Sequence, residues 1–259
     1  MGGQACSKTG QIAVSGQAPV DPYGYIVPSA AHSTGAAGTN WRSDVAAVNW
    51  TGDQATLHLA FYDYATGAAS VATRVLAGSA TVEWKDILVS VFGVSTSASV
   101  KGTLLIGSDQ ALAISSRTYN QENATRTYGQ YYPALFVDYP GGHAEHAIAT
   151  GDTGILAGLK KDAAYRTNVG IVNLSQAPCT ITVQLINGTG DAVGSARAIT
   201  AAARLWKQED DIFTKTGAGN QEVAYARLTV PTSGCTAWAY ASVIDQNTGD
   251  PTTIPILLR

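Results

Sequence analysis

The side chains best suited to contact a ligand form an aromatic cluster between positions 117 and 139 of the 259-residue chain. Tyrosine combines a rigid, flat, apolar ring with a hydroxyl group, which suits stacking on a sugar or burial in a protein interface. The segment therefore predicts a binding surface made of Arg117, Tyr119, Tyr128, Tyr131, Tyr132 and Tyr139. The alternative is that these rings pack between two folded units and stiffen the connection between them.

Patterns typical of catalysis are missing from the sequence, which contains no G-x-S-x-G, H-E-x-x-H or phosphate-loop motif. Glu209, Asp210 and Asp211 are adjacent carboxylates, whereas glycoside hydrolysis needs two carboxylates that face each other about 5–9.5 Å apart. The start of a short helix, where acidic groups interact favourably with the helix dipole, suits them better. We therefore expect a protein that is not an enzyme and has no catalytic residue, with a hydrolase as the least favoured function.

Two groups of residues are weak candidates for a metal site. His143 and His146 lie three residues apart and would need a third ligand such as His32. A solvated turn is the favoured interpretation of that segment. Asp245 and Asp250 offer oxygen ligands in a loop whose spacing differs from the EF-hand pattern. A turn held by side-chain hydrogen bonds fits this loop better, so we predict no metal and no cofactor.

The charge distribution excludes several classes of partner. Sixteen Lys and Arg residues stand against nineteen Asp and Glu residues, and no basic cluster is longer than Lys160-Lys161. This pattern gives no electrostatic footprint for nucleic acid. The apolar runs are far shorter than the roughly 20 residues of a membrane-spanning helix. We expect neither a nucleic-acid partner nor a membrane span.

An internal repeat indicates how the chain is organised. Segment 41–49 (WRSDVAAVN) matches 165–173 (YRTNVGIVN) at an offset of 124 residues, and 55–63 matches 179–187 at the same offset. Further on, 84–88 matches 206–213 if the second copy has three additional residues, and 103–106 matches 227–230. The repeat predicts an N-terminal extension over 1–23, a first domain over 24–140 and a second over 141–259.

Each copy has the pattern of an antiparallel β-protein. Alternating apolar and polar residues in short runs, separated by Gly, Asn and Asp turns, predict strands. In the first copy they cover 42–49, 55–62, 70–76, 80–84, 100–106 and 111–119, and in the second 166–173, 179–186, 194–200, 203–207, 222–230 and 235–244. One short helix is expected in each copy, at 85–92 and 208–214. The prediction is an all-β chain of two tandem immunoglobulin-like antiparallel β-sandwiches.

The three cysteines lack the spacing of a metal site. At the offset of 124, Cys179 and Cys235 correspond to Ala55 and Ala111, two small residues. If these positions are neighbours in the fold, a disulfide can join them in the second copy. We therefore predict a Cys179–Cys235 disulfide, which favours an oxidising compartment and leaves Cys6 unpaired.

The motifs WRSDVAAVNW, SSRTYNQ, TYGQYYPAL and YRTNVGIVNLS resemble a repeat of secreted or surface-exposed bacterial proteins. The resemblance covers almost the whole chain. It implies a secreted, non-catalytic β-sandwich module of unassigned activity, and it supplies no catalytic residues. The second copy departs from the R-T-Y-N element, since it has Ser242-Val243-Ile244-Asp245 there.

Two functions fit these observations. The first is a secreted or cell-surface module for binding or adhesion that contacts a protein or a glycan through the tyrosine-rich surface. The second is a structural subunit that self-associates through sandwich edges into a filament or layer, because edge strands carry unpaired backbone groups and the low charge gives little repulsion.

Overall fold

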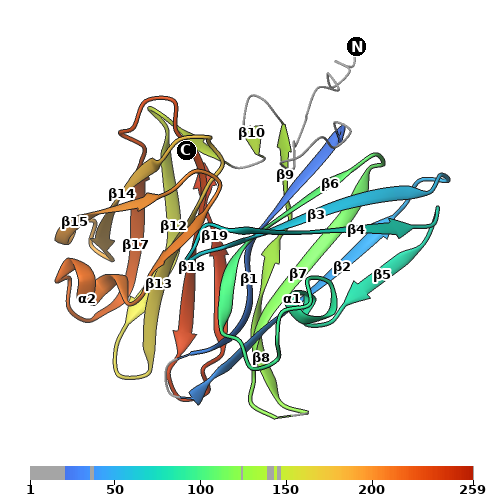
Figure 1. Cartoon of the computed structure of the whole chain (residues 1–259). Coiled ribbons are helices and arrows are strands. Elements are labelled where there is room, and N and C mark those ends of the chain that lie inside the picture. Colours follow the sequence, from blue (N-terminus) through green and yellow to red (C-terminus); the bar gives the residue numbers. More distant parts are fainter. Residues whose placement is uncertain (1–20, 36–37, 124, 139–142, 145–146, 259) are drawn as a thin grey trace.

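The computed structural model describes residues 21–35, 38–123, 125–138, 143–144 and 147–258. Nearly all of this is β-structure, in two halves that lie side by side (Figure 1). The first half contains β1 (Tyr23–Thr34), β2 (Asn40–Asn49), β3 (Ala55–Asp63), β4 (Ala69–Leu76), β5 (Thr81–Trp84), α1 (Ile87–Ser90), β6 (Val100–Ser108), β7 (Leu112–Gln121), β8 (Thr127–Pro133) and β9 (Leu135–Asp138). The short β10 (His143–Ala144) pairs with β9.

The second half contains β11 (Ile148–Ala149), β12 (Thr153–Lys161), β13 (Tyr165–Asn173), β14 (Cys179–Asn187), β15 (Ala192–Ala201), β16 (Trp206–Glu209), α2 (Ile212–Thr216), β17 (Gln221–Thr229), β18 (Thr236–Asp245), β19 (Pro251–Pro255) and β20 (Leu257–Leu258). Both helices are short, and among the described residues no helix is long and apolar enough to cross a membrane.

Each half consists of two antiparallel layers with matching strand order. The layers are β4-β3-β6-β1 and β5-β2-β7-β8 in the first half, and β15-β14-β17-β12 and β16-β13-β18-β19 in the second. In the first half the end of β1 also pairs with the start of β2, which joins the two layers into one continuous sheet. The predicted all-β sandwich is therefore confirmed. As in an immunoglobulin domain, the second strand pairs with the fifth and the third with the sixth. The first, fourth and seventh strands lie in the opposite layers from their immunoglobulin positions.

The core of each half lies between its layers, because successive side chains of a strand point to opposite faces. Leu57 and Leu59 of β3 share a buried cluster with Val45 and Ala47 of β2. The matching core residues of the second half are Ile181, Val183, Val169 and Ile171. The apolar alternation that predicted these strands thus also identifies their buried faces.

The short helices are held by a side chain from the neighbouring strand. Each follows an aspartate with left-handed backbone, Asp86 at φ 42° and Asp211 at φ 45°. The backbone N–H of Asp86 donates to Asp44 Oδ1 at 2.9 Å, and that of Asp211 donates to Asn168 Oδ1 at 3.0 Å. The recurring Asp or Asn of the repeat therefore fixes the strand-to-helix turn.

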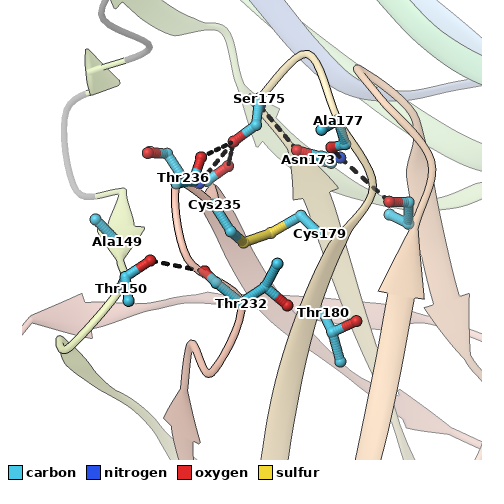
Figure 2. Close-up of a disulfide and its surroundings, with 12 residues drawn as sticks. Ala149, Thr150, Asn173, Ser175, Ala177, Cys179, Thr180, Thr232, Cys235 and Thr236 are labelled. Carbon is cyan, nitrogen blue, oxygen red and sulfur yellow. Dashed lines mark hydrogen bonds between the residues drawn. A yellow bond between two sulfur atoms is a disulfide. The ribbon is translucent and has the colours of Figure 1, made fainter.

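The predicted Cys179–Cys235 disulfide is present (Figure 2). It joins the first residue of β14 to the residue before β18, so it links the two layers of the second half. Both cysteines are buried. Next to the bridge, the N–H of Thr236 donates to Ser175 Oγ at 2.7 Å. Cys6 lies outside the described residues.

Strand register corrects two details of the predicted repeat. Val45 pairs with Trp84 in the first half, and its counterpart Val169 pairs with Glu209. Trp84 therefore corresponds to Glu209 rather than to Trp206, and no three-residue insertion is needed. Similarly, Ile106 corresponds to Leu228, because they pair with Leu59 and Val183. The predicted match of 103–106 with 227–230 is wrong by two residues.

The contact between the halves includes aromatic side chains of the second half that have no aromatic counterpart at the matching strand positions of the first half. Tyr240 is fully buried, and its ring lies edge-on to the Tyr132 ring of the first half at 5.0 Å. Trp206 Nε1 donates to the Tyr240 hydroxyl at 2.7 Å. Gly170 lies beneath this ring, since a Cβ at that position would be 2.3 Å from Tyr240 Cε1. The first half has Ala46 paired with Ser115 where the second has Gly170 paired with Tyr240.

We predict that Gly170→Ala lowers the free energy of unfolding by about 1–3 kcal/mol, because Tyr240 is fixed on both sides and cannot move away from the new methyl group. Urea unfolding followed by tryptophan fluorescence measures this loss. Gly188→Ala is the control, since its Cβ would meet no atom closer than 3.6 Å. Equal stability of the two variants would show that the Tyr240 ring is not held in place.

Candidate functional site

The structure distributes the predicted tyrosine surface over two faces of one hairpin. Arg117 of β7 pairs directly with Tyr131 of β8, whereas Ser116 pairs with Tyr132. Neighbouring residues of a strand point in opposite directions, so Tyr131 and Tyr132 lie on opposite faces. Tyr131 is 56% exposed and Tyr132 is 2% exposed. The six predicted residues therefore do not form one surface.

Tyr119 has a structural environment. It is buried, its hydroxyl donates to Asp44 Oδ1 at 3.1 Å, and the Arg117 guanidinium lies 4.8 Å from its ring centroid. Burial and then the Asp44 carboxylate raise the pKa of Tyr119 to about 12. Tyr128 accepts a 2.8 Å hydrogen bond from Arg126 at the surface. Tyr139 lies outside the described residues.

Tyr132 belongs to the contact between the halves, which is the alternative that the sequence left open. Gln130 Nε2 donates to the Tyr132 hydroxyl. The Gln130 carbonyl oxygen in turn accepts hydrogen bonds from Ser242 at 2.8 Å and from Thr253 at 3.1 Å. Burial raises the pKa of Tyr132 well above its usual value. The hydrogen bonds fix β8 of the first half against β18 and β19 of the second.

A cleft of about 550 Å³ opens beside this contact, between the two halves. The first half contributes residues of β1, β2, β6, β7 and β8, and the second contributes residues of β13, β16, β18 and β19. The aromatic and charged residues that line it are Trp41, Tyr132, Trp206, Lys101, Arg166, Asp210, Asp211 and Asp245. Of the predicted surface residues that the structure describes, Tyr132 alone lines this cleft.

Two tryptophans form the aromatic part of the cleft. Trp41 is partly exposed at the second position of β2, and Gly35 allows its indole to lie close to the backbone, since a Cβ there would be 2.7 Å from Trp41 Nε1. Trp206 is more deeply buried, and Lys101 Nζ lies 5.7 Å from its ring centroid. The rings lie on different halves, so a ligand between them would contact both halves.

Arg166 and Lys101 are the cationic residues that line the cleft, and Lys101 lies over the Trp206 ring. Arg166 Nη1 donates to Asn168 Oδ1 at 2.8 Å, and Asn168 is buried. Since Asn168 Oδ1 also accepts from the N–H of Asp211, the amide is held in place by the start of α2. The arginine side chain is therefore oriented by a neutral amide.

The carboxylates that line the cleft already accept hydrogen bonds from other groups of the protein. Asp211 contacts Lys161 Nζ and the Thr214 hydroxyl; burial opposes ionisation, but these hydrogen bonds outweigh it and lower the pKa of Asp211. Asp245 Oδ1 accepts from the N–H of Asn247 at 2.7 Å in the β18–β19 turn. Asp210 is exposed and accepts from Gln208 Nε2 at 3.2 Å. The predicted helix-start role holds for Asp211, and the predicted hydrogen-bonded turn holds for Asp245.

The predicted weak metal candidates do not come together where the structure describes them. His32 is buried, with Nδ1 2.7 Å from Asp86 Oδ2 and Nε2 3.1 Å from the carbonyl oxygen of Thr96. Both of its ring nitrogens thus have protein partners. His146 and the side chain of His143 lie outside the described part of the structure. Within the described residues, no group of three or more His, Cys, Asp or Glu side chains could hold a metal ion.

Fold and cleft together define an all-β sandwich protein with a ligand-sized cleft between its halves. No family model matches the chain, and no curated protein matches it. Among solved structures it is similar to Streptomyces avermitilis α-L-rhamnosidase in complex with L-rhamnose, at 12% identity and a TM-score of 0.23 over 91% of this chain and 27% of that chain. A second is Bacteroides uniformis β-glucuronidase, at 10% identity and a TM-score of 0.18 over 85% of this chain and 26% of that chain.

The chain therefore spans about a quarter of the length of these two enzymes.

Proposed function

We propose that the protein is a secreted, non-catalytic binding module whose ligand is a glycan, and that the glycan binds in the cleft between the halves. The observation that carries this proposal is the pairing of tryptophan rings with fixed polar side chains in one cleft of about 550 Å³. Sugars have apolar faces that stack on aromatic rings and hydroxyl groups that exchange hydrogen bonds with amides and carboxylates. Trp41 and Trp206 supply the rings, and Gln208 and Asp210 supply hydrogen-bonding groups.

The Cys179–Cys235 disulfide supports secretion, because such bridges form and persist in oxidising compartments. Its burial between the layers of the second half is typical of a structural bridge. Measuring secretion directly, by expressing the gene in its host and separating cell and medium fractions, tests this part of the proposal.

Self-assembly is the second candidate function, and β4 favours it. This strand lies at the edge of the β4-β3-β6-β1 layer of the first half, and it exposes Val71 and Val75 at 62% and 60%. An exposed apolar edge strand is a template for pairing with another chain. Light scattering on a size-exclusion column distinguishes the candidates: a monomer of 26.8 kDa supports the binding module, and large regular particles support assembly.

We predict that Trp41→Ala weakens binding of the best ligand from a glycan array by about tenfold or more, because it removes a stacking ring from the cleft. Isothermal titration calorimetry measures the affinity. Tyr131→Ala is the matched control, since its exposed ring lies on the face of β8 opposite to Tyr132. Loss of binding in Tyr131→Ala with normal binding in Trp41→Ala would move the site to the outer face of the hairpin.

A further inference from the structure

The arginine that recurs in both halves, Arg42 in the first and Arg166 in the second, has different side-chain partners in each half. Arg42 and Arg166 occupy the same place, since Arg42 pairs across the sheet with Tyr119 and Arg166 pairs with Ile244. In the first half Arg42 Nε lies 3.4 Å from Asp86 Oδ2, the carboxylate of the left-handed residue before α1. The charge of Arg42 is thereby neutralised within the protein.

In the second half the corresponding carboxylate is already occupied. Asp211, the counterpart of Asp86, forms its ion pair with Lys161. The other acidic neighbour has also changed, because Asp44 of the first half is replaced by Asn168. Arg166 consequently forms no ion pair within the described residues, and its guanidinium donates one side-chain hydrogen bond, to the neutral Asn168.

The remaining acidic groups of the cleft do not replace that partner. Asp245 is engaged by N–H groups of its own turn, and Asp210 is exposed and bonded to Gln208. Guanidinium carries five N–H donors in a fixed planar arrangement that matches a carboxylate in a bidentate pair. An arginine with unused donors, oriented by a buried amide and facing a cleft, is arranged for an anionic group of a ligand.

We infer that Arg166 binds a carboxylate of the ligand, so that the glycans recognised in this cleft are acidic: they contain a uronic or sialic acid residue. This inference rests on the proposed glycan-binding function. Trp41 and Trp206 contact the sugar rings, and Arg166 selects ligands that carry the carboxylate over neutral sugars of the same shape.

The test uses the whole chain on an array of uronate- and sialate-containing oligosaccharides, each printed beside its counterpart with the carboxylate reduced to a hydroxymethyl group. The acidic member of the best pair is expected to bind about 10- to 100-fold more tightly than the reduced one, as hydrogen bonds to a charged group contribute. Arg166→Gln should remove most of that difference while leaving the affinity for the reduced glycan within about twofold.

Two further variants keep the test decisive. Arg117→Gln, which changes an exposed arginine outside the cleft, should bind like the wild-type protein. Arg166→Lys keeps the charge but loses the planar donor pair, so it should retain part of the preference, and it serves if Arg166→Gln fails to fold. Equal binding of acidic and reduced glycans would overturn the inference and leave the proposed function standing. Binding of no glycan on the array would overturn both.

Discussion

Replacing Asn173 with aspartate is expected to lower the free energy of unfolding by about 3–5 kcal/mol. The side chain of Asn173 is fully buried, and its Nδ2 donates to the carbonyl oxygens of Ala177, Ala201 and Ala202 at 2.7, 3.1 and 3.0 Å. Aspartate has the same shape but no donor when ionised, so a buried negative charge would face three acceptors. Urea unfolding at pH 7, followed by tryptophan fluorescence, measures the loss.

Two matched variants show whether the loss arises from that geometry. Asn49 occupies the corresponding place in the first half and donates to the carbonyl oxygens of Asp53, Leu76 and Ala77, so Asn49→Asp should cost as much. Asn187 uses its Oδ1 as an acceptor in the β14–β15 turn, and Asn187→Asp should change stability by less than about 1 kcal/mol. A small effect at Asn173 would mean that the three carbonyl groups find other donors.

The strands with uninterrupted alternation could be predicted from the sequence. Segments 55–62 and 166–173, for example, coincide with β3 and β13 to within one residue at each end. The apolar residues of such strands face a core on one side only, so the period of two is visible in the residue types. The equivalence of Asn49 and Asn173 was also visible, although their shared role in closing a loop was not.

Other strands were missed because local features hide their alternation. β1 and β12 each contain a register shift, between Val27 and Ala30 and between Leu156 and Leu159, which moves later side chains to the other face. β19 begins and ends with proline, a residue that normally argues against a strand. Proline is tolerated here because β19 lies at the edge of its layer and its backbone pairs with one strand of the described structure, β18.

The cleft could not be predicted because its residues are distant in sequence. Trp41 and Arg166 come from different halves, whereas the tyrosine-rich segment is continuous in sequence but alternates between the two faces of its hairpin. The side on which the halves meet could have been inferred from positions where the two halves carry different residue types. Strand register places Trp206 opposite Val172 where the first half has Thr81, and Tyr240 opposite Gly170 where it has Ser115. Trp206 and Tyr240, aromatic residues that the first half lacks at the corresponding positions, lie on the side on which the halves meet.

Removing the disulfide is the second change with a large expected effect. The double variant Cys179→Ala, Cys235→Ala should lower the free energy of unfolding by about 4 kcal/mol, because the bridge closes a loop with a sequence separation of 56 residues in the unfolded chain. Replacing both cysteines avoids leaving a reactive thiol in the core. Urea unfolding of the double variant and the wild-type protein under non-reducing conditions measures the difference.

The two halves provide an internal reference for this loss. The first half has the buried Ala55 at the position of Cys179, and its layers are held by core packing and by the pairing of β1 with β2 instead of a bridge. The double variant is expected to keep the sandwich fold through its own packed core while its second half unfolds at a lower urea concentration. Titration of thiols in the denatured, unreduced wild-type protein should find one, from Cys6. Three thiols, or a double variant as stable as the wild type, would show that the layers of the second half are held by packing alone.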